Sequence, residues 1–174
     1  MADKLKVLYS EQEVNARISE LGTQISKDFA GKEVHLICIL KGSAFFMCEL
    51  AKRITVPVTI DFMSVSSYGN GKNSSGIVRI SKDLDEALEG RHVIIVEDII
   101  DSGKTLNYLI PVLYARKPLE IKLCTLLSKP SRREVEIDVD YVGFEIPDAF
   151  VVGYGLDHAQ NYRNLPYIAT VEEE

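Results

Sequence analysis

Acidic and hydroxyl-bearing residues follow a short apolar run near the middle of the sequence. Val93–Val96 precedes Glu97 and Asp98, and after two more apolar residues comes the turn Asp101–Thr105. Two adjacent carboxylates at a strand end can hold vicinal hydroxyls or a hard cation. The turn would place unpaired backbone N–H groups at a helix start, where they bind phosphate. The segment Val93–Leu106 therefore predicts a site for a phosphorylated ribose, with the phosphate on Asp101, Ser102, Gly103, Lys104 and Thr105.

This segment has two other interpretations. Glu97 and Asp98 could be solvated residues at a strand end, with Asp101 as a helix N-cap. Three acids and Ser-Gly-Lys-Thr directly after a buried strand exceed what capping requires. A P-loop, G-x-x-x-x-G-K-[ST], is the competing phosphate motif. It needs a glycine five residues before Gly103, where this chain has Asp98.

Other loops carry residues that could bind ligands. Lys41-Gly42 offers one cation and one unhindered amide, which suits pyrophosphate. Lys129 could donate a hydrogen bond to a carbonyl oxygen, and Asp157 could hold Mg²⁺. Arg163 could bind phosphate oxygens as a fork, and Phe150 could stack on a planar base. Taken singly, each has a plainer explanation, because lysine and arginine are mostly solvated and phenylalanine is mostly core.

The chain alternates between strand-like and helix-like segments that would position these residues. Ser10 and Glu13 form a capping box, after which apolar residues at helical spacing run to Gly31. His35–Leu40 is nearly continuous in apolar residues, as in a strand buried on both faces. Such alternation predicts an α/β fold with a mainly parallel central sheet and ligands at the carboxyl ends of its strands. The remaining expectations are helices over Gly42–Ile54 and Gly103–Arg116, the latter disturbed by Pro111; strands over Val56–Val65, Ile77–Ser81, Arg91–Glu97, Ile121–Leu127, Tyr141–Ile146 and Val151–Tyr154; and a loop over Ser66–Gly76.

Composition narrows the class of protein. The sequence has 174 residues, 46% hydrophobic and 26% charged, which predicts one soluble domain over residues 1–174. No apolar run could span a bilayer, and the N-terminus has no signal-peptide core. The net charge of −6 argues against a nucleic-acid binder driven by bulk electrostatics. Cys38, Cys48 and Cys124 are odd in number and lie in apolar runs, so we expect buried free thiols in a reducing compartment and a cytoplasmic location, and they lack metal-ligand spacing.

The run VIIVEDIIDSGKT resembles the phosphoribosyl-pyrophosphate (PRPP) signature of type I phosphoribosyltransferases, with two acids, two apolar residues and then D-S-G-x-T. Residues 147–165, PDAFVVGYGLDHAQNYRNL, resemble the base and metal site of the hypoxanthine-guanine members. The likeness covers roughly Val34–Val171. It implies the type I fold, with a small hood built from N- and C-terminal segments. It also implies Mg²⁺-dependent transfer of the phosphoribosyl group from PRPP to N9 of a 6-oxopurine.

The resemblance also assigns roles to residues. It puts Glu97 and Asp98 on the ribose hydroxyls and makes Asp101 the general base facing N7 of the purine. Lys129 would bind the exocyclic oxygen at position 6 and so select against adenine. The Leu40-Lys41 peptide is typically cis in this family. The other implied sets are Lys41, Gly42 and Arg163 for pyrophosphate; Ser67 and Tyr68 in a flexible loop that closes over the reacting centre; Lys129, Phe150, Val151 and Asp157 for the purine; and Glu97, Asp98 and Asp157 for Mg²⁺.

Alternatives remain within this resemblance. A regulatory RNA-binding protein can share the fold and the signature, but it needs a basic face, and only Lys129–Arg133 gathers basic residues. A xanthine- or guanine-preferring transferase would differ in small contacts around Val151 and Leu156, worth about 1–3 kcal/mol each. The family commonly forms homodimers or homotetramers. We expect that state here, with PRPP and a 6-oxopurine as partners and neither nucleic acid nor membrane.

Overall fold

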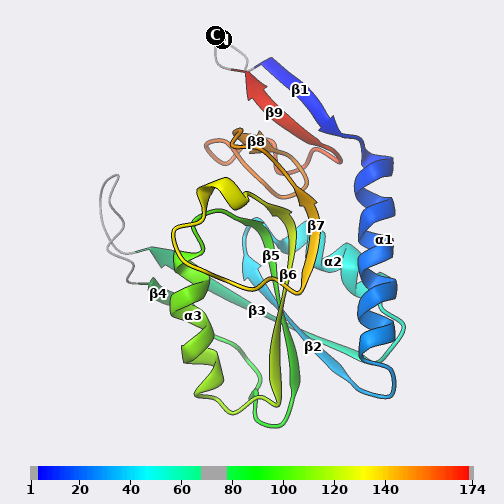
Figure 1. Cartoon of the computed structure of the whole chain (residues 1–174), viewed down its shortest axis with the longest axis vertical. Helices are drawn as coiled ribbons and strands as arrows, with labels where there is room; N and C mark the ends of the chain where they lie inside the picture. The colour runs from blue at the N-terminus through cyan, green and yellow to red at the C-terminus, as the bar shows by residue number, and fades with distance from the viewer. Residues whose placement is uncertain (1–3, 68–77, 173–174) are drawn as a thin grey trace.

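The computed structural model describes residues 4–67 and 78–172, and its centre is a six-stranded sheet (Figure 1). The strand order is β4-β3-β2-β5-β6-β7, and every neighbouring pair is parallel except β3 and β4. The expected α/β fold with a mainly parallel sheet is therefore confirmed. The strands are β2 (Val34–Leu40), β3 (Val58–Ser67), β4 (Val78–Lys82), β5 (His92–Ile100), β6 (Glu120–Ser128) and β7 (Tyr141–Glu145).

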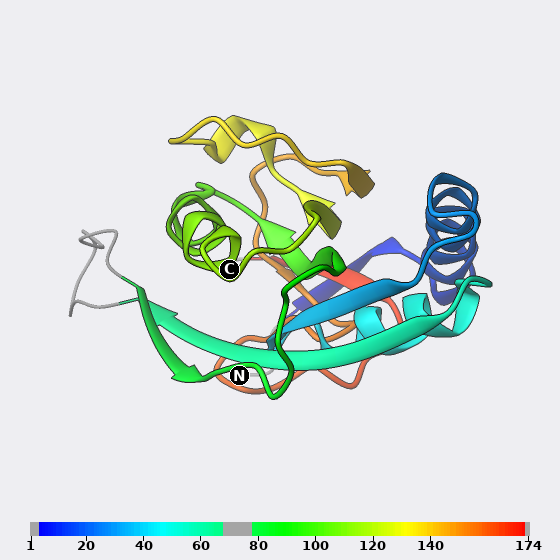
Figure 2. The same ribbon diagram turned by 90° about the horizontal axis from the view of Figure 1, so that it is seen from below.

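Strand β2 illustrates how both faces of this sheet are buried. Successive side chains of a strand point to opposite faces, and all residues of β2 but the last are buried. Leu36 and Cys38 join one hydrophobic core, whereas Ile37 and Ile39 join another. Helices α1 and α2 contribute to the first core and α3 to the second, so helices lie on both sides of the sheet (Figure 2). The helices are α1 (Glu11–Asp28), α2 (Ala44–Arg53), α3 (Lys104–Tyr114) and the short 3₁₀ turn η1 (Pro130–Arg132).

The capping box at the start of α1 is confirmed. The Ser10 backbone N–H donates to Glu13 Oε2 at 2.8 Å, and the Glu13 N–H donates to Ser10 Oγ at 3.2 Å. These bonds satisfy groups that the first turn of a helix leaves unpaired. The helix ends at Asp28, and Gly31 then takes a φ of 76°, a left-handed conformation that favours glycine.

A second sheet joins the two ends of the chain. Its strands β1 (Lys4–Tyr9), β9 (Ile168–Glu172) and β8 (Val151–Val152) pair antiparallel in the order β1-β9-β8. In Figure 1 this sheet lies beyond one end of the six-stranded sheet, as the expected hood does. The expected strand Val151–Tyr154 is shorter than predicted. It belongs to the hood because its partner is β9.

Strand β5 is longer than the sequence suggested. We expected it to end at Glu97, but its ladder with β6 runs on to Ile100, paired with Ser128. Glu97 and Asp98 therefore lie within the strand, which fixes their directions more tightly than a loop would.

Two further expectations need correction. Cys48 is exposed, whereas Cys38 and Cys124 are buried as expected. The buried face of α2 is formed by Phe46, Met47 and Leu50, which turns residue 48 outward. Helix α3 continues through Pro111 and ends at Tyr114, two residues before the predicted end. Among the helices of the described chain, none has the length and apolarity needed to cross a membrane.

Candidate active site

The turn between β5 and α3 is shaped by Gly103. This residue is the N-cap of α3, has a φ of 81°, and is followed by a helix start that has no side-chain cap. A side chain is also excluded by packing, because a Cβ would come within 2.9 Å of Ile137 Cδ1. Ser102 Oγ accepts a hydrogen bond from the Lys104 N–H at 3.3 Å. A helix start without a capping side chain can offer its N–H groups to an anion.

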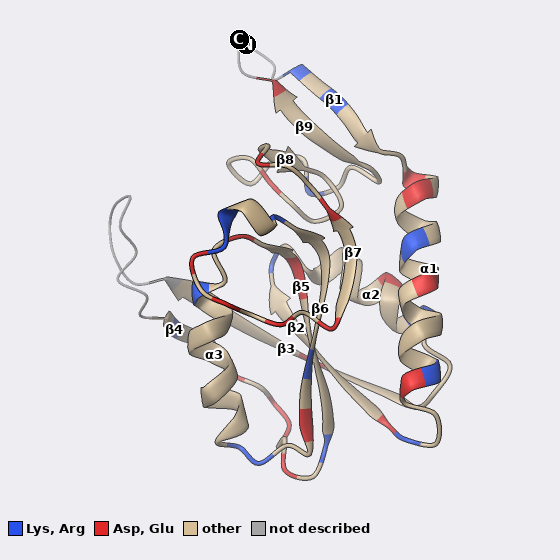
Figure 3. Ribbon diagram, viewed as in Figure 1, with Lys and Arg blue, Asp and Glu red and all other residues tan. Residues whose placement is uncertain are grey.

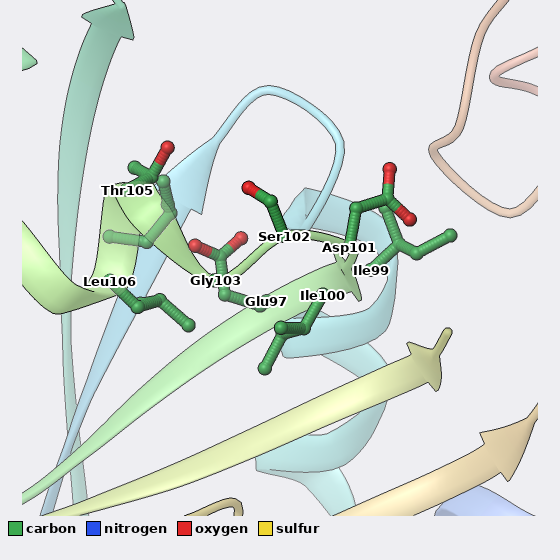
Figure 4. A pocket seen from close by; sticks show the side chains of 9 residues that line it. Glu97, Ile99, Ile100, Asp101, Ser102, Gly103, Thr105 and Leu106 are labelled. Carbon is green, nitrogen blue, oxygen red and sulfur yellow. The ribbon is translucent and has the colours of Figure 1, made fainter. Parts of the chain in front are cut away.

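A cavity of about 340 Å³ opens at this turn (Figure 4). It brings together five of the residues expected to bind phosphoribose: Glu97, Asp101, Ser102, Gly103 and Thr105. Figure 4 shows Asp101 at the opposite end of the turn from Thr105. The apolar part of the wall comes from Ile39, Ile99, Ile100 and Leu106.

Glu97 and Asp98 face opposite sides of the sheet, because successive residues of a strand alternate. Glu97 is buried and lines the cavity, whereas Asp98 lies against the backbone of Gly42. Lys104, expected on the phosphate, pairs with Glu134. Ser43, also in the loop after β2, is close enough to Glu97 to act on its pKa, so both acids lie beside that loop.

Both carboxyl groups are held in an environment that disfavours their charge. Burial, and then the neighbouring Asp98, raise the pKa of Glu97 well above its usual value. Burial also raises the pKa of Asp98 to about 6, although its backbone hydrogen bonds and Arg163 act in the opposite direction. A bound cation or a hydroxyl donor would relieve this penalty, since either stabilises the charged form.

The loop after β2 is packed tightly against the rest of the site. The Leu40-Lys41 peptide is cis, as the resemblance implied. A Cβ at Gly42 would overlap the carboxylate of Asp98, and a Cβ at Gly155 would overlap the Gly42 carbonyl oxygen. Glycine is therefore required at both positions. The expected pyrophosphate loop is thereby pressed between β5 and the segment that follows β8.

Arg163 and Asp157, expected on pyrophosphate and metal, form an ion pair. Arg163 Nη2 lies 2.9 Å from Asp157 Oδ1, and Nη1 donates to the Gly155 carbonyl at 2.6 Å. The other carboxylate oxygen of Asp157 accepts the Gln160 N–H at 2.8 Å. Arg163 Nε is buried without a hydrogen-bond partner. The pair lies close enough to the acidic strand for Arg163 to lower the pKa of Asp98.

The acids of this site fit a weakly held Mg²⁺ better than a closed metal site. Within residues 4–67 and 78–172, no group of three or more His, Cys, Asp and Glu side chains could enclose a metal. Mg²⁺ usually keeps several waters and takes one or two carboxylates together with substrate phosphates. Glu97 and Asp98 meet that smaller requirement, because a cation would offset the penalty on their charged forms. Asp157 would share its carboxylate with Arg163.

Lys129 comes to the phosphate turn from the end of β6. Its side chain is buried, and its Nζ lies 3.8 Å from Asp101 Oδ1 and 3.9 Å from Asp148 Oδ1. Its backbone N–H donates to the Ile100 carbonyl at 3.0 Å. The lysine expected to bind the purine and the acid expected to act as the base therefore lie next to each other.

Phe150 and Val151 lie at the start of the hood strand β8. The Phe150 side chain is 53% exposed, so it is available for stacking and is not part of the core. Its ring meets His158 edge to face with 5.3 Å between centroids. Val151 is buried, and its backbone pairs with Thr170 of β9. The expectation from residue type alone, that Phe150 belongs to the core, is therefore wrong.

Three more residues bear on the site: Ser67, Tyr68 and Arg133. Ser67 is the last residue of β3, and Tyr68 lies outside the described residues. Sequence reasoning missed Arg133, whose side chain donates to the carbonyl oxygens of Ile100 and Asp101. The sequence signal for this arginine is the basic run Lys129–Arg133.

Comparison with known proteins identifies the family. The phosphoribosyl transferase domain family matches residues 5–159. A hypoxanthine phosphoribosyltransferase of Haemophilus influenzae is 53% identical over 168 residues, covering 95% of this chain and 94% of that protein. A crystal structure of a hypoxanthine-guanine phosphoribosyltransferase from Bacillus anthracis superposes with a TM-score of 0.94 at 49% identity, covering 98% of this chain and 100% of the other.

A third relative is much longer than this chain. The bifunctional protein TilS/HprT of Listeria monocytogenes is 52% identical over 172 residues. That match includes 99% of this chain but only 26% of the Listeria protein. By domain match, by identity over nearly its whole length and by structure, the chain belongs to the type I phosphoribosyltransferases, in the hypoxanthine-guanine phosphoribosyltransferase family.

Proposed function

We propose that this protein transfers the 5-phosphoribosyl group of PRPP to N9 of hypoxanthine, and also of guanine, in purine salvage. The products are the nucleoside monophosphate, IMP or GMP, and pyrophosphate. The observation that carries the proposal is the 3.8 Å approach of Lys129 to Asp101 at the mouth of an uncapped phosphate turn. This arrangement brings together a hydrogen-bond donor for a 6-oxo group, a general base and a phosphate site. Residues 1–174 would act as one domain.

The site has a compartment for each part of the two substrates. The 5′-phosphate would bind the turn Asp101–Thr105, and Glu97 and Asp98 would meet the ribose hydroxyls. Pyrophosphate would bind Lys41, the Gly42 amide and Arg163, whose guanidinium would exchange its present partners for phosphate oxygens. The purine would stack on exposed Phe150, with Lys129 on its oxygen and the Val151 backbone at its edge.

The reaction would break the bond from C1′ to the pyrophosphate oxygen and form the bond from C1′ to N9. Asp101 would accept the proton that the purine loses, through its position facing N7. Lys129 would hold the base in register while donating to its oxygen. Lys41 and Arg163 would neutralise charge on the departing pyrophosphate.

Mg²⁺ would be held by Glu97, Asp98 and Asp157 together with substrate oxygens. Once bound, it would neutralise negative charge on the pyrophosphate group. The protein's own contribution includes the carboxylates of Glu97 and Asp98, whose charged forms are disfavoured by burial. Activity should therefore disappear when Mg²⁺ is chelated.

The distribution of charged residues and the exposed apolar side chains support the proposals on nucleic acid and on subunit assembly. In Figure 3, positions of Lys and Arg are interspersed with positions of Asp and Glu along the described ribbon, and the net charge is −6, so we propose no nucleic-acid partner. We propose a cytoplasmic homodimer or homotetramer. Exposed apolar side chains on α2 and α3, Phe45 at 48% and Tyr114 at 49%, are available for subunit contacts.

The proposal is tested by product analysis. The protein is incubated with PRPP, Mg²⁺ and hypoxanthine, and IMP and pyrophosphate are quantified by chromatography and mass spectrometry. Equal amounts of the two products are expected, and chelator should stop their formation. Absence of IMP with folded protein, together with specific RNA binding, would favour the regulatory alternative.

A further inference from the structure

Arg133 makes a three-point contact that residue type alone would not suggest. It follows η1, and its guanidinium is partly buried. Nη1 donates to the carbonyl oxygens of Ile100 at 2.7 Å and Asp101 at 2.6 Å. Nη2 donates to Ser128 Oγ at 2.8 Å. One side chain therefore links the ends of β5 and β6.

The same segment also holds the next carbonyl of the turn. The N–H groups of Glu134 and Val135 donate to the Ser102 carbonyl at 3.0 and 3.3 Å. Three consecutive carbonyl groups, those of Ile100, Asp101 and Ser102, are thus bound by the segment from residue 129 to residue 135.

This arrangement has a consequence for the other side of each peptide. In a trans peptide the N–H points opposite to the C=O, because the unit is planar. When the three carbonyls turn toward Arg133 and its neighbours, the N–H groups of Asp101, Ser102 and Gly103 turn the other way. These three residues line the cavity at the phosphate turn. A charged donor on the carbonyl also polarises the peptide and strengthens its N–H as a donor.

We propose that Arg133 is a positioning residue that aims the backbone N–H groups of the turn at the 5′-phosphate and holds Asp101 beside Lys129. The proposal rests on the proposed phosphoribosyl transfer. Its bond to Ser128 connects the phosphate turn to the residue directly before Lys129, so one guanidinium sets the distance between the PRPP and purine halves of the site. Lysine cannot replace it, because an ammonium group lacks the planar fork that reaches both strands.

The test compares Arg133→Lys and Arg133→Ala with wild type. The expected result is a rise in KM for PRPP of about tenfold or more and a fall in kcat, with a smaller rise in KM for hypoxanthine, since two of the three lost contacts act on the phosphate turn. Calorimetry with ribose 5-phosphate should show the same loss of affinity. Arg133→Lys should recover little of it, although the charge is retained.

Arg116→Ala is the matched control. Arg116 donates to both carboxylate oxygens of Asp83, at 2.7 and 2.9 Å, beyond the far end of α3 from the turn. It loses the same charge and should keep wild-type KM values. A purely structural Arg133 would lower the thermal midpoint and leave the kinetic constants of the folded fraction unchanged, which would overturn the proposal, as would full recovery in Arg133→Lys.

The binding measurement separates this proposal from the proposed function. If wild-type protein binds ribose 5-phosphate but makes no IMP, the function is wrong while Arg133 is still judged by its effect on affinity. If Arg133→Ala does not fold, Arg133→Lys and Arg133→Gln retain side-chain volume and carry the test. Wild-type affinity in both would contradict the positioning role.

Discussion

The carboxylate of Asp98 occupies the space that any side chain at Gly42 would need. This contact joins the loop after β2 to the middle of the acidic strand β5. It is a relationship between two proposed subsites, pyrophosphate and ribose. A substitution at Gly42 should therefore alter ribose binding through Asp98, even though Gly42 is not proposed to contact the ribose.

Gly42→Ala tests this relationship. The added methyl group must displace the Asp98 carboxylate, so kcat/KM for PRPP should fall by about a hundredfold, with KM for hypoxanthine little changed. Steady-state kinetics with PRPP as the varied substrate measures the effect.

A double-mutant cycle provides the control. In an Asp98→Ala background the displaced carboxylate is absent, so adding Gly42→Ala should cost little more. Additive losses from the two changes would mean that Gly42 acts through some other contact.

The raised pKa of Asp98 predicts an unusual dependence of stability on pH. Because that pKa rises from 3.8 to about 6 on folding, the folded protein retains a proton that the unfolded chain has already released. The free energy of unfolding should therefore fall as pH rises from about 4 to about 6, by up to about 3 kcal/mol from this group. Urea unfolding without divalent metal measures it.

Asp98→Asn is the matched protein for this experiment, since it keeps the shape and removes the titration. Its stability should vary less across the same window, because it lacks both the titration of Asp98 and the effect of the Asp98 charge on the pKa of Glu97. If the two proteins show equal slopes, Asp98 ionises normally and the claimed penalty on its charge is wrong.

Asp101→Asn should separate binding from chemistry. The amide keeps the size of the side chain but cannot accept the purine proton, so kcat should fall by about a hundredfold or more. KM for PRPP should change little, because the backbone of the turn is intact. Wild-type turnover in this variant would remove Asp101 from the role of base.

Lys129→Ala should weaken the choice of base. Loss of the Nζ donor removes a hydrogen bond to the 6-oxo group and should reduce kcat/KM for hypoxanthine by about ten- to a hundredfold. The ratio of hypoxanthine to adenine activity should fall with it. Competition assays with the two bases give this ratio, and an unchanged value would exclude Lys129 from the base site.

Most of the fold could be predicted from patterns of residues that lie close together in the sequence. The capping box at Ser10 and the buried run that became β2 depend on residues close in sequence, and both were correct. The hood assignment of Val151–Val152 was not readable from periodicity, because it depends on pairing with β9, well removed in the chain. The outward direction of Cys48 depends on the rotation of α2, which a run of apolar residues does not specify.

In the candidate site too, a local motif could be predicted and a long-range contact could not. Glu97 and the turn Asp101–Thr105 were found because one short motif carries them. Arg133 was missed because its acceptors, Ile100 and Asp101, lie 33 and 32 residues earlier, and its role is to hold backbone. Every residue has a backbone carbonyl oxygen, so the types of residues in a sequence do not predict which side chain binds to one.

The central claim is that this site joins phosphoribose to a purine that carries a 6-oxo group. Initial rates with PRPP and Mg²⁺ should be compared for hypoxanthine, guanine, xanthine and adenine under identical conditions. We expect efficient conversion of hypoxanthine and guanine, with adenine slower by at least about a hundredfold, because its amino group would face the Lys129 donor. Equal use of adenine, or no conversion of any base by folded protein, would contradict it.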